Sequence, residues 1–298
     1  MATRTYRSFA KINLHLQVDG RYPDGYHRLT TIFQTVSLHD LISLEILAEP
    51  TITLRVPGGG APEGEGNLAW RAAHEALNRW APGRGARIEI RKRIPSGGGL
   101  GGGSSNAAVV LSAIPEILGV TVDPSEMTEV ARTLGADVPF FLVGGTALGT
   151  GRGDEISPLP DLEEQEVVLV NPGISVSTAE IFGALELPEG RANPAGLLSV
   201  LESGSCVRIA DLDAFNDLEE PVLERVPEVR SVYTALRQAG ATCVRLSGSG
   251  GTVFACFAPS RRGREVELDL PDEARVYAAR TVSRAALNEA RSAAGEGD

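Results

Sequence analysis

A run of glycines that ends in small polar residues constrains this 298-residue chain more than any other stretch: I-P-S-G-G-G-L-G-G-G-S-S-N-A-A, residues 94–108. An alternating, strand-like segment precedes it at 86–94, and an apolar helical pattern follows at 107–118. Glycine lets the backbone approach a ligand closely, and free N–H groups at a helix N-terminus attract anions. The polar residues 104–106 are good N-caps, so we expect them to begin the helix. The stretch therefore predicts a phosphate site.

Two common phosphate motifs do not fit this loop. The Walker A motif needs a lysine directly after its last glycine, and Ser104 follows here. The dinucleotide motif G-x-G-x-x-G matches a loop this rich in glycine by chance, and no acidic residue at a strand end about 20 residues later supports it. A flexible linker is the remaining alternative, but a linker rarely has a strand on one side and an apolar helix on the other.

The charge balance excludes several classes of partner. The net charge is −11 and the sequence pI is about 5.0, whereas a nucleic-acid surface needs a basic patch. The N-terminal stretch lacks the apolar core of a signal peptide, and no apolar run reaches the roughly 18 residues of a membrane span. The cysteines at 206, 243 and 256 are odd in number and widely spaced, which favours reduced core thiols. We expect a cytoplasmic protein with no nucleic-acid or membrane partner.

The length is typical of one large or two ordinary domains. We place a boundary at the acidic, polar stretch 161–166, which gives units 1–160 and 161–298. Strands and helices alternate in the second unit, which favours a compact α+β domain.

Three polar positions outside the glycine stretch are candidate site residues. Residues 8–18 alternate between apolar and polar side chains, so Lys11 and Asn13 share the polar face of a half-buried strand. Either both side chains bind the same ligand, or this face of the strand is exposed to solvent. Asp137 stands between Ala136 and an apolar run, where a partly buried carboxylate needs a partner. The alternative for Asp137 is the N-cap of the next helix.

Two further segments carry side chains that suit a nucleotide. The turn P-D-G presents Tyr26 and His27 together, and these rings either stack on and hydrogen-bond a planar base or are incidental loop residues. Lys92 and Arg93 close a strand just before the glycines and either reach a phosphate or stay exposed. Asn67 is expected to cap a helix over 68–80, whose tryptophans have core spacing.

These features together resemble the GHMP small-molecule kinase superfamily. The resemblance rests on A-K-I-N-L at 10–14, the glycine stretch, and S-G-S-G at 247–250. More specific are D-G-Y-H at 24–27, I-F-Q at 32–34, L-G-A-D-V-P at 134–139 and N-D-L-E at 216–219. They resemble the branch that phosphorylates a CDP-linked methylerythritol in the non-mevalonate isoprenoid pathway. Phe9, where that branch usually has proline, and Gly251, where alanine is common, are departures that remove no polar group.

The resemblance implies an α+β, two-domain GHMP kinase fold, with an N-terminal ribosomal-protein-S5-like α/β domain and a C-terminal ferredoxin-like α+β domain around a cleft. It implies transfer of the ATP γ-phosphate to the substrate's 2-hydroxyl, with Mg²⁺ bridging phosphate oxygens. Lys11 and Asp137 become the catalytic pair, and Asn13, Tyr26, His27 and Phe182 bind substrate. The implied ATP site comprises Asn67, Pro95, Gly97, Gly98, Gly99, Leu100, Gly101, Gly102, Gly103, Ser104, Ser105 and Asn106. The resemblance names no protein ligand for Mg²⁺; Ser105 is our hypothesis.

The chemistry of phosphoryl transfer fits these assignments. Its loose transition state needs positioning and charge neutralisation more than covalent help, and a carboxylate is too weak a base to ionise an alcohol beforehand. We therefore expect Asp137 to orient the hydroxyl and accept its proton late, while Lys11 holds geometry and offsets charge. Two alternatives stay open: a GHMP kinase for another small alcohol, such as mevalonate or homoserine, and a non-catalytic sensor that binds ATP and a ligand.

Overall fold

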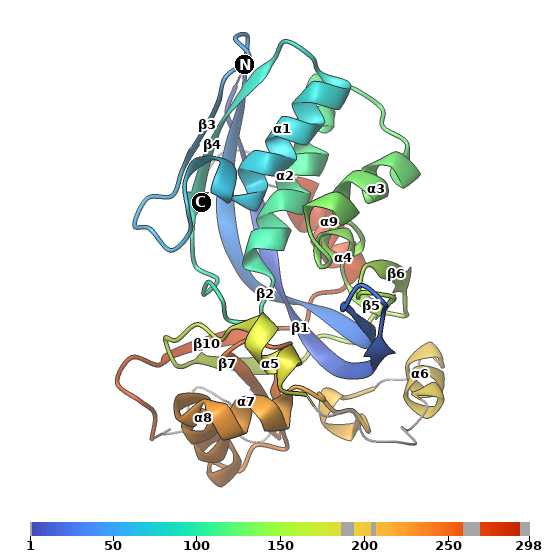
Figure 1. The fold of residues 1–298 in the computed structure, drawn as a ribbon, viewed down its shortest axis with the longest axis vertical. Coiled ribbons are helices and arrows are strands. Elements are labelled where there is room, and N and C mark those ends of the chain that lie inside the picture. Colours follow the sequence, from blue (N-terminus) through green and yellow to red (C-terminus); the bar gives the residue numbers. More distant parts are fainter. Residues whose placement is uncertain (1, 186–193, 204–206, 259–268, 293–298) are drawn as a thin grey trace.

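The computed structural model describes residues 2–185, 194–203, 207–258 and 269–292 and contains two sheets (Figure 1). The first sheet has the order β3-β4-β2-β5-β6, with β1 paired antiparallel to β2. Its helices pack together beside the sheet, and α2 contacts both β1 and β2. The strands are β1 (Arg4–Arg21), β2 (His27–Leu47), β3 (Ile52–Arg55), β4 (Gly85–Arg91), β5 (Thr146–Thr150) and β6 (Glu155–Pro158). The helices are η1 (Gly64–Gly66), α1 (Leu68–Trp80), α2 (Gly102–Leu118), α3 (Pro124–Leu134) and α4 (Val138–Val143).

Helix α1 forms where its cap and its apolar spacing predict it. The side chain of Asn67 accepts a hydrogen bond from the N–H of Ala69 at 2.9 Å and so begins the helix. Small residues at helical spacing then form the buried face, which lets α2 approach closely. Both tryptophans pack partly buried against this core, as expected. Helix α3 likewise starts at a capping side chain, because Asp123 accepts a hydrogen bond from the N–H of Ser125, and it ends before Gly135.

The second sheet is antiparallel with the order β10-β7-β9-β8. Numbered along the chain, this is the 4-1-3-2 order of the expected ferredoxin-like domain, and α8 packs on β7, β8 and β9. The strands are β7 (Glu166–Asn171), β8 (Cys243–Leu246), β9 (Val253–Cys256) and β10 (Arg275–Arg280). The helices between β7 and β8 are α5 (Thr178–Gly183), α6 (Ala195–Glu202), η2 (Ile209–Asp211), α7 (Glu219–Arg225) and α8 (Pro227–Gln238).

The chain returns to the first sheet after β10. The N–H of Val282 donates to the carbonyl of Thr35 at 2.9 Å. Helix α9 (Arg284–Ser292) then packs so closely that a Cβ on Gly144 would lie 2.1 Å from Leu287. Neither β10 nor α9 was predicted from the sequence. The boundary at residue 160 stays a prediction, because residues on both sides of it contribute to one apolar core, among them Ile12 and Phe254.

Two local predictions were wrong. The first strand is not half exposed, because Lys11 and Asn13 are each 3 % exposed and the second sheet's connecting segments cover that face. Helix α2 begins at Gly102, so Ser104, Ser105 and Asn106 are not its caps; the cap is Gly101, whose left-handed φ of 69° turns the chain into the helix earlier.

Two expectations about the whole chain can be compared with the described residues. Cys243 and Cys256 are free, as expected, and Cys206 lies outside the described residues. In the part of the chain that the structure describes, no helix has the length and apolar character needed to cross a membrane.

Candidate active site

The glycine loop, residues 95–101, packs so closely against neighbouring segments that several of its positions have no room for a side chain. Gly97, Gly99 and Gly101 all have left-handed φ values, of 70°, 78° and 69°. A Cβ on Gly99 would lie 2.1 Å from the carbonyl oxygen of Ser247, and one on Gly101 would lie 2.7 Å from the Phe141 ring. Glycine is therefore needed here for both backbone conformation and close packing.

A cavity of about 360 Å³ surrounds this loop. It is lined by every residue of the implied ATP site except Ser105. The opposite wall of the cavity was not predicted, because the Gly/Pro-rich segment before α1 has the composition of an ordinary connecting loop. The lining residues that the sequence did not assign to the site are Gly60, Ala61, Pro62, Gly66, Leu68 and Ser96. Lys92, one of two candidate phosphate ligands, also lines the cavity, whereas Arg93 does not.

A buried polar network supports the floor of the cavity. Asp40 is fully buried and accepts hydrogen bonds from Lys92 Nζ at 2.5 Å and from the N–H groups of Arg93 and Ile94 at 2.7 and 2.9 Å. Asn106 Nδ2 also donates to Asp40, at 3.0 Å. Asp40 thus fixes the strand end that enters the glycine loop, and it was not recognised from the sequence.

Ser105 faces the protein core. Its hydroxyl lies 2.7 Å from Ser8 Oγ, and the residue is 1 % exposed. The hypothesis that Ser105 binds Mg²⁺ is therefore not supported by its orientation. Ser104 is the helix serine that lines the cavity.

Lys11, Asn13 and Asp137 come together beside the loop. Lys11 Nζ donates to Asn13 Oδ1 at 2.7 Å and lies 3.5 Å from Asp137 Oδ2. The backbone N–H of Lys11 donates to the carbonyl of Leu100 at 3.0 Å, which joins β1 to the glycine loop. Asp137 occupies the N-cap position of α4, as the alternative expected, but its side chain makes no capping hydrogen bond and is 34 % exposed. Its carboxylate remains accessible to a hydroxyl.

Two of the implied substrate-binding residues are in direct contact. The rings of His27 and Phe182 lie with their centroids 4.7 Å apart and their planes tilted by 32°. Tyr26 is 59 % exposed and packs on the guanidinium of Arg152 at 4.2 Å. Arg21 Nε donates to His27 Nε2 at 2.9 Å. Burial and, after it, the Arg21 charge lower the pKa of His27. Because Nε2 accepts from Arg21, the proton of the neutral ring lies on Nδ1, which can act as a donor.

The comparisons with known proteins agree on one family. The descriptions "GHMP kinases N terminal domain" and "GHMP kinases C terminal" match residues 67–145 and 200–275. A 4-diphosphocytidyl-2-C-methyl-D-erythritol kinase of Geobacter sp. (strain M21) is 41 % identical over 88 % of this chain and 92 % of its own. The kinase of the same name from Desulfotalea psychrophila is 42 % identical over 87 % and 88 %. This chain belongs to the 4-diphosphocytidyl-2-C-methyl-D-erythritol kinase family.

Solved structures support membership in this kinase family. A crystal structure of a 4-(cytidine 5'-diphospho)-2C-methyl-D-erythritol kinase superimposes with a TM-score of 0.73 and 35 % identity, covering 93 % of this chain and 98 % of that one. A homoserine kinase from Cytophaga hutchinsonii has a TM-score of 0.69 at 18 % identity over 95 % and 98 %, which shows a shared fold alone.

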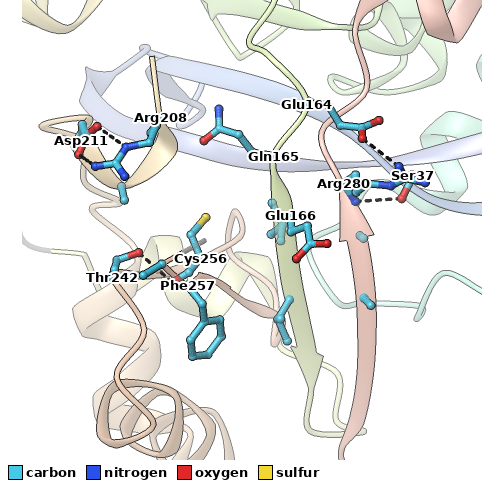
Figure 2. Close-up of a pocket in the computed structure, with 16 residues that line it drawn as sticks. Ser37, Glu164, Gln165, Glu166, Arg208, Asp211, Thr242, Cys256, Phe257 and Arg280 are labelled. Carbon is cyan, nitrogen blue, oxygen red and sulfur yellow. Dashed lines mark hydrogen bonds and ion pairs between the residues drawn. The ribbon is translucent and has the colours of Figure 1, made fainter. Parts of the chain in front are cut away.

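A second cavity, of about 910 Å³, lies beside β7 and β10, away from the residues that carry the family's motifs (Figure 2). Four of its five charged lining residues form two ion pairs: Arg208 contacts Asp211 at 2.7 Å, and Arg280 contacts Glu164 at 2.9 Å. None of the implied site residues lines this cavity, whereas most of the implied ATP-site residues line the smaller one.

Proposed function

We propose that this protein catalyses ATP-dependent phosphorylation of the 2-hydroxyl of 4-diphosphocytidyl-2-C-methyl-D-erythritol, a step of the non-mevalonate isoprenoid pathway in the cytoplasm. One observation carries the assignment to these residues: Lys11 bonds to the glycine loop through its backbone and faces Asp137 through its Nζ. The same strand, β1, thus connects the phosphate cavity with the carboxylate that would receive the acceptor hydroxyl.

The glycine loop would bind the ATP phosphates. Its backbone N–H groups and the N-terminus of α2 need no reorganisation during transfer. Lys92 Nζ adds a positive charge at the cavity wall, held by Asp40.

The donors present suit a Mg²⁺ ion that ATP brings with it. Among the described residues there is no cluster of three or more His, Cys, Asp or Glu side chains that would form a protein cage. Mg²⁺ characteristically keeps several waters and binds one or two carboxylates plus substrate phosphates. The hydroxyl of Ser104, which lines the cavity, would hold it, and the ion would neutralise charge on the transferred phosphate.

Lys11 and Asp137 have separate roles in this proposal. Asp137 orients the acceptor hydroxyl and accepts its proton late, because phosphoryl transfer depends mainly on alignment and charge neutralisation. Lys11 is held rigidly, because Asn13 accepts from its ammonium group and is itself bonded to Thr31 Oγ1 at 2.8 Å. Its charge offsets the negative charge that develops on the transferred oxygen.

The cytosine would stack at the His27–Phe182 pair. Stacking of a base on an aromatic ring contributes roughly 1–3 kcal/mol and tolerates any base. Selection requires a hydrogen bond, and His27 Nδ1–H can donate to an acceptor on the cytosine edge. The Arg21 bond fixes this tautomer.

The decisive assay measures ADP release with ATP, Mg²⁺ and 4-diphosphocytidyl-2-C-methyl-D-erythritol, mevalonate or homoserine, each compared with a reaction containing excess EDTA. We expect Mg²⁺-dependent turnover with the CDP-linked alcohol alone. Turnover of mevalonate or homoserine instead would assign another kinase activity. Binding of ATP and the CDP-linked alcohol with no ADP release would favour a sensor.

A further inference from the structure

The N-D-L-E motif at 216–219 has no role in the reaction described so far, yet it lies against the strand that carries Lys11. Residues 215–217 run alongside β1: the N–H of Leu16 donates to the carbonyl of Phe215, and the N–H of Asp217 donates to the carbonyl of Leu16, both at 2.9 Å. Asp217 Oδ2 also accepts from the N–H of Val18 at 2.6 Å. The motif is thereby fixed to β1 through the backbone.

The Asn216 side chain reaches from this position to the second glycine turn, residues 247–251. Its Nδ2 donates to the carbonyls of Leu246 at 3.0 Å and Gly248 at 2.8 Å, while its Oδ1 accepts from the N–H of Leu218 at 3.0 Å. Asn216 is 7 % exposed. Glu219 Oε2 accepts from the N–H of Leu246 at 2.7 Å. One short motif therefore binds both the entry and the middle of the turn.

The turn contacts Lys11, Asn13 and the glycine loop at once. A Cβ on Gly248 would lie 3.1 Å from Asn13 Oδ1 and 3.4 Å from Lys11 Nζ, so the backbone of Gly248 borders both side chains. On its other side, Ser247 Oγ donates to the carbonyl of Gly99 at 3.1 Å. The residue after the turn continues this contact, because the N–H of Thr252 donates to the carbonyl of Gly98 at 3.1 Å.

A third contact of the turn is with α5, the helix that carries Phe182 of the proposed base pocket (His27 and Phe182). Ser249 Oγ lies 2.7 Å from Thr178 Oγ1, at the first residue of α5. The same helix carries Phe182, which stacks on His27. The turn therefore contacts the glycine loop, the Lys11–Asn13 pair and helix α5. Asn216 holds this turn through its two hydrogen bonds.

We propose that Asn216 is a positioning residue, which holds the turn 247–251 so that the transferred phosphate and the acceptor hydroxyl align. The proposal rests on the kinase reaction given above and adds a residue to it. Asn216 contacts neither Lys11 nor the glycine loop directly, so its effect passes through backbone carbonyls. Misplacement of reacting groups by about 1 Å costs on the order of 10²-fold in rate.

The test compares Asn216→Ala with wild type in the ADP-release assay, beside equilibrium binding of an unreactive ATP analogue and of the CDP-linked alcohol. We expect kcat to fall about 10²-fold while both dissociation constants stay within about threefold, because the loop glycines and the aromatic pair keep their own structure. Asn78→Ala, on the exposed face of α1, is the matched control and keeps wild-type kcat.

A second variant keeps the proposal testable if Asn216→Ala fails to fold. Asn216→Asp keeps the side-chain volume and the acceptor for Leu218 but places a carboxylate oxygen against two carbonyls, so kcat should fall in a folded protein. Far-ultraviolet circular dichroism and thermal unfolding establish the folded state of each variant. Wild-type kcat in a folded Asn216→Ala or Asn216→Asp protein overturns the proposal. A wild-type chain that phosphorylates none of the three alcohols rejects the kinase function itself, and the inference with it.

Discussion

Lys11 Nζ lies 3.5 Å from Asp137 Oδ2, and the two side chains differ sharply in exposure, 4 % against 34 %. The ammonium group is fixed by its surroundings, whereas the carboxylate faces solvent on one side. This asymmetry suits a cation that holds a transferred phosphate and a carboxylate that meets an incoming hydroxyl.

Asp137→Asn should lower kcat by about 10²-fold or more, the lower end of the usual contribution of a general base. The amide keeps the size of the side chain but cannot accept the proton as a carboxylate does. Steady-state ADP release measures the effect. Undiminished turnover would move the proton acceptor to another group.

The pH dependence of substrate binding should report on His27. Its pKa lies below the ordinary value because of burial and the Arg21 charge, so the neutral ring persists when the pH falls below that value. Protonation turns Nε2 into a donor that faces the Arg21 donor, so the ring loses its fixed position and the KM for the CDP-linked alcohol should rise at acid pH, while the KM for ATP keeps its profile. Arg21→Ala removes this conflict between two donors, so the rise in KM at acid pH should shrink. An equal rise in the variant would exclude His27 as the titrating group.

Gly99→Ala should impair both stability and ATP binding. A left-handed alanine costs about 1–3 kcal/mol, and its Cβ would collide with the Ser247 carbonyl. Gly196→Ala is the matched control, because Gly196 lies inside α6 with no atom within 4 Å of the added Cβ. That change should raise stability by up to about 1 kcal/mol. Urea unfolding and the KM for ATP separate the two substitutions; equal stabilities would contradict the packing argument.

Asp40→Ala should destabilise the fold by about 3–5 kcal/mol, because it leaves the Lys92 ammonium buried without its partner. Glu164→Ala breaks the Arg280 pair, in which both side chains are more than half exposed, and should cost less than about 1 kcal/mol. Urea titrations of both variants provide the measurement. A small loss for Asp40→Ala would mean that water replaces the carboxylate.

The elements with strong local signals could be predicted from the sequence. Asn67 and Asp123 begin their helices because an N-cap side chain acts within three residues of its own position. The glycine loop was located for a similar reason, since its backbone requirement is local. The pairing of Lys11 with Asn13 followed from strand alternation.

The features that could not be predicted from the sequence depend on contacts between segments far apart in the chain. Burial of the polar face of β1 comes from residues near 216, which no periodicity in 8–18 reveals. Asp40 looks like an ordinary residue in a strand, and only the folded chain brings Lys92 and Asn106 to it. The pairing of His27 rather than Tyr26 with Phe182 depends equally on where α5 lies.

The return of the chain to the first sheet through Val282 and α9 affects how the protein is made. The backbone bond from Val282 to Thr35 joins residues separated by most of the polypeptide, so this edge of the N-terminal sheet is completed only after residue 282 has been synthesised. Domains usually fold as units during translation, N-terminal first. Here the first sheet would emerge from the ribosome with β2 and Gly144 still lacking these neighbours. The first sheet would therefore reach its final packing only after the second sheet's last strand, β10, has been synthesised.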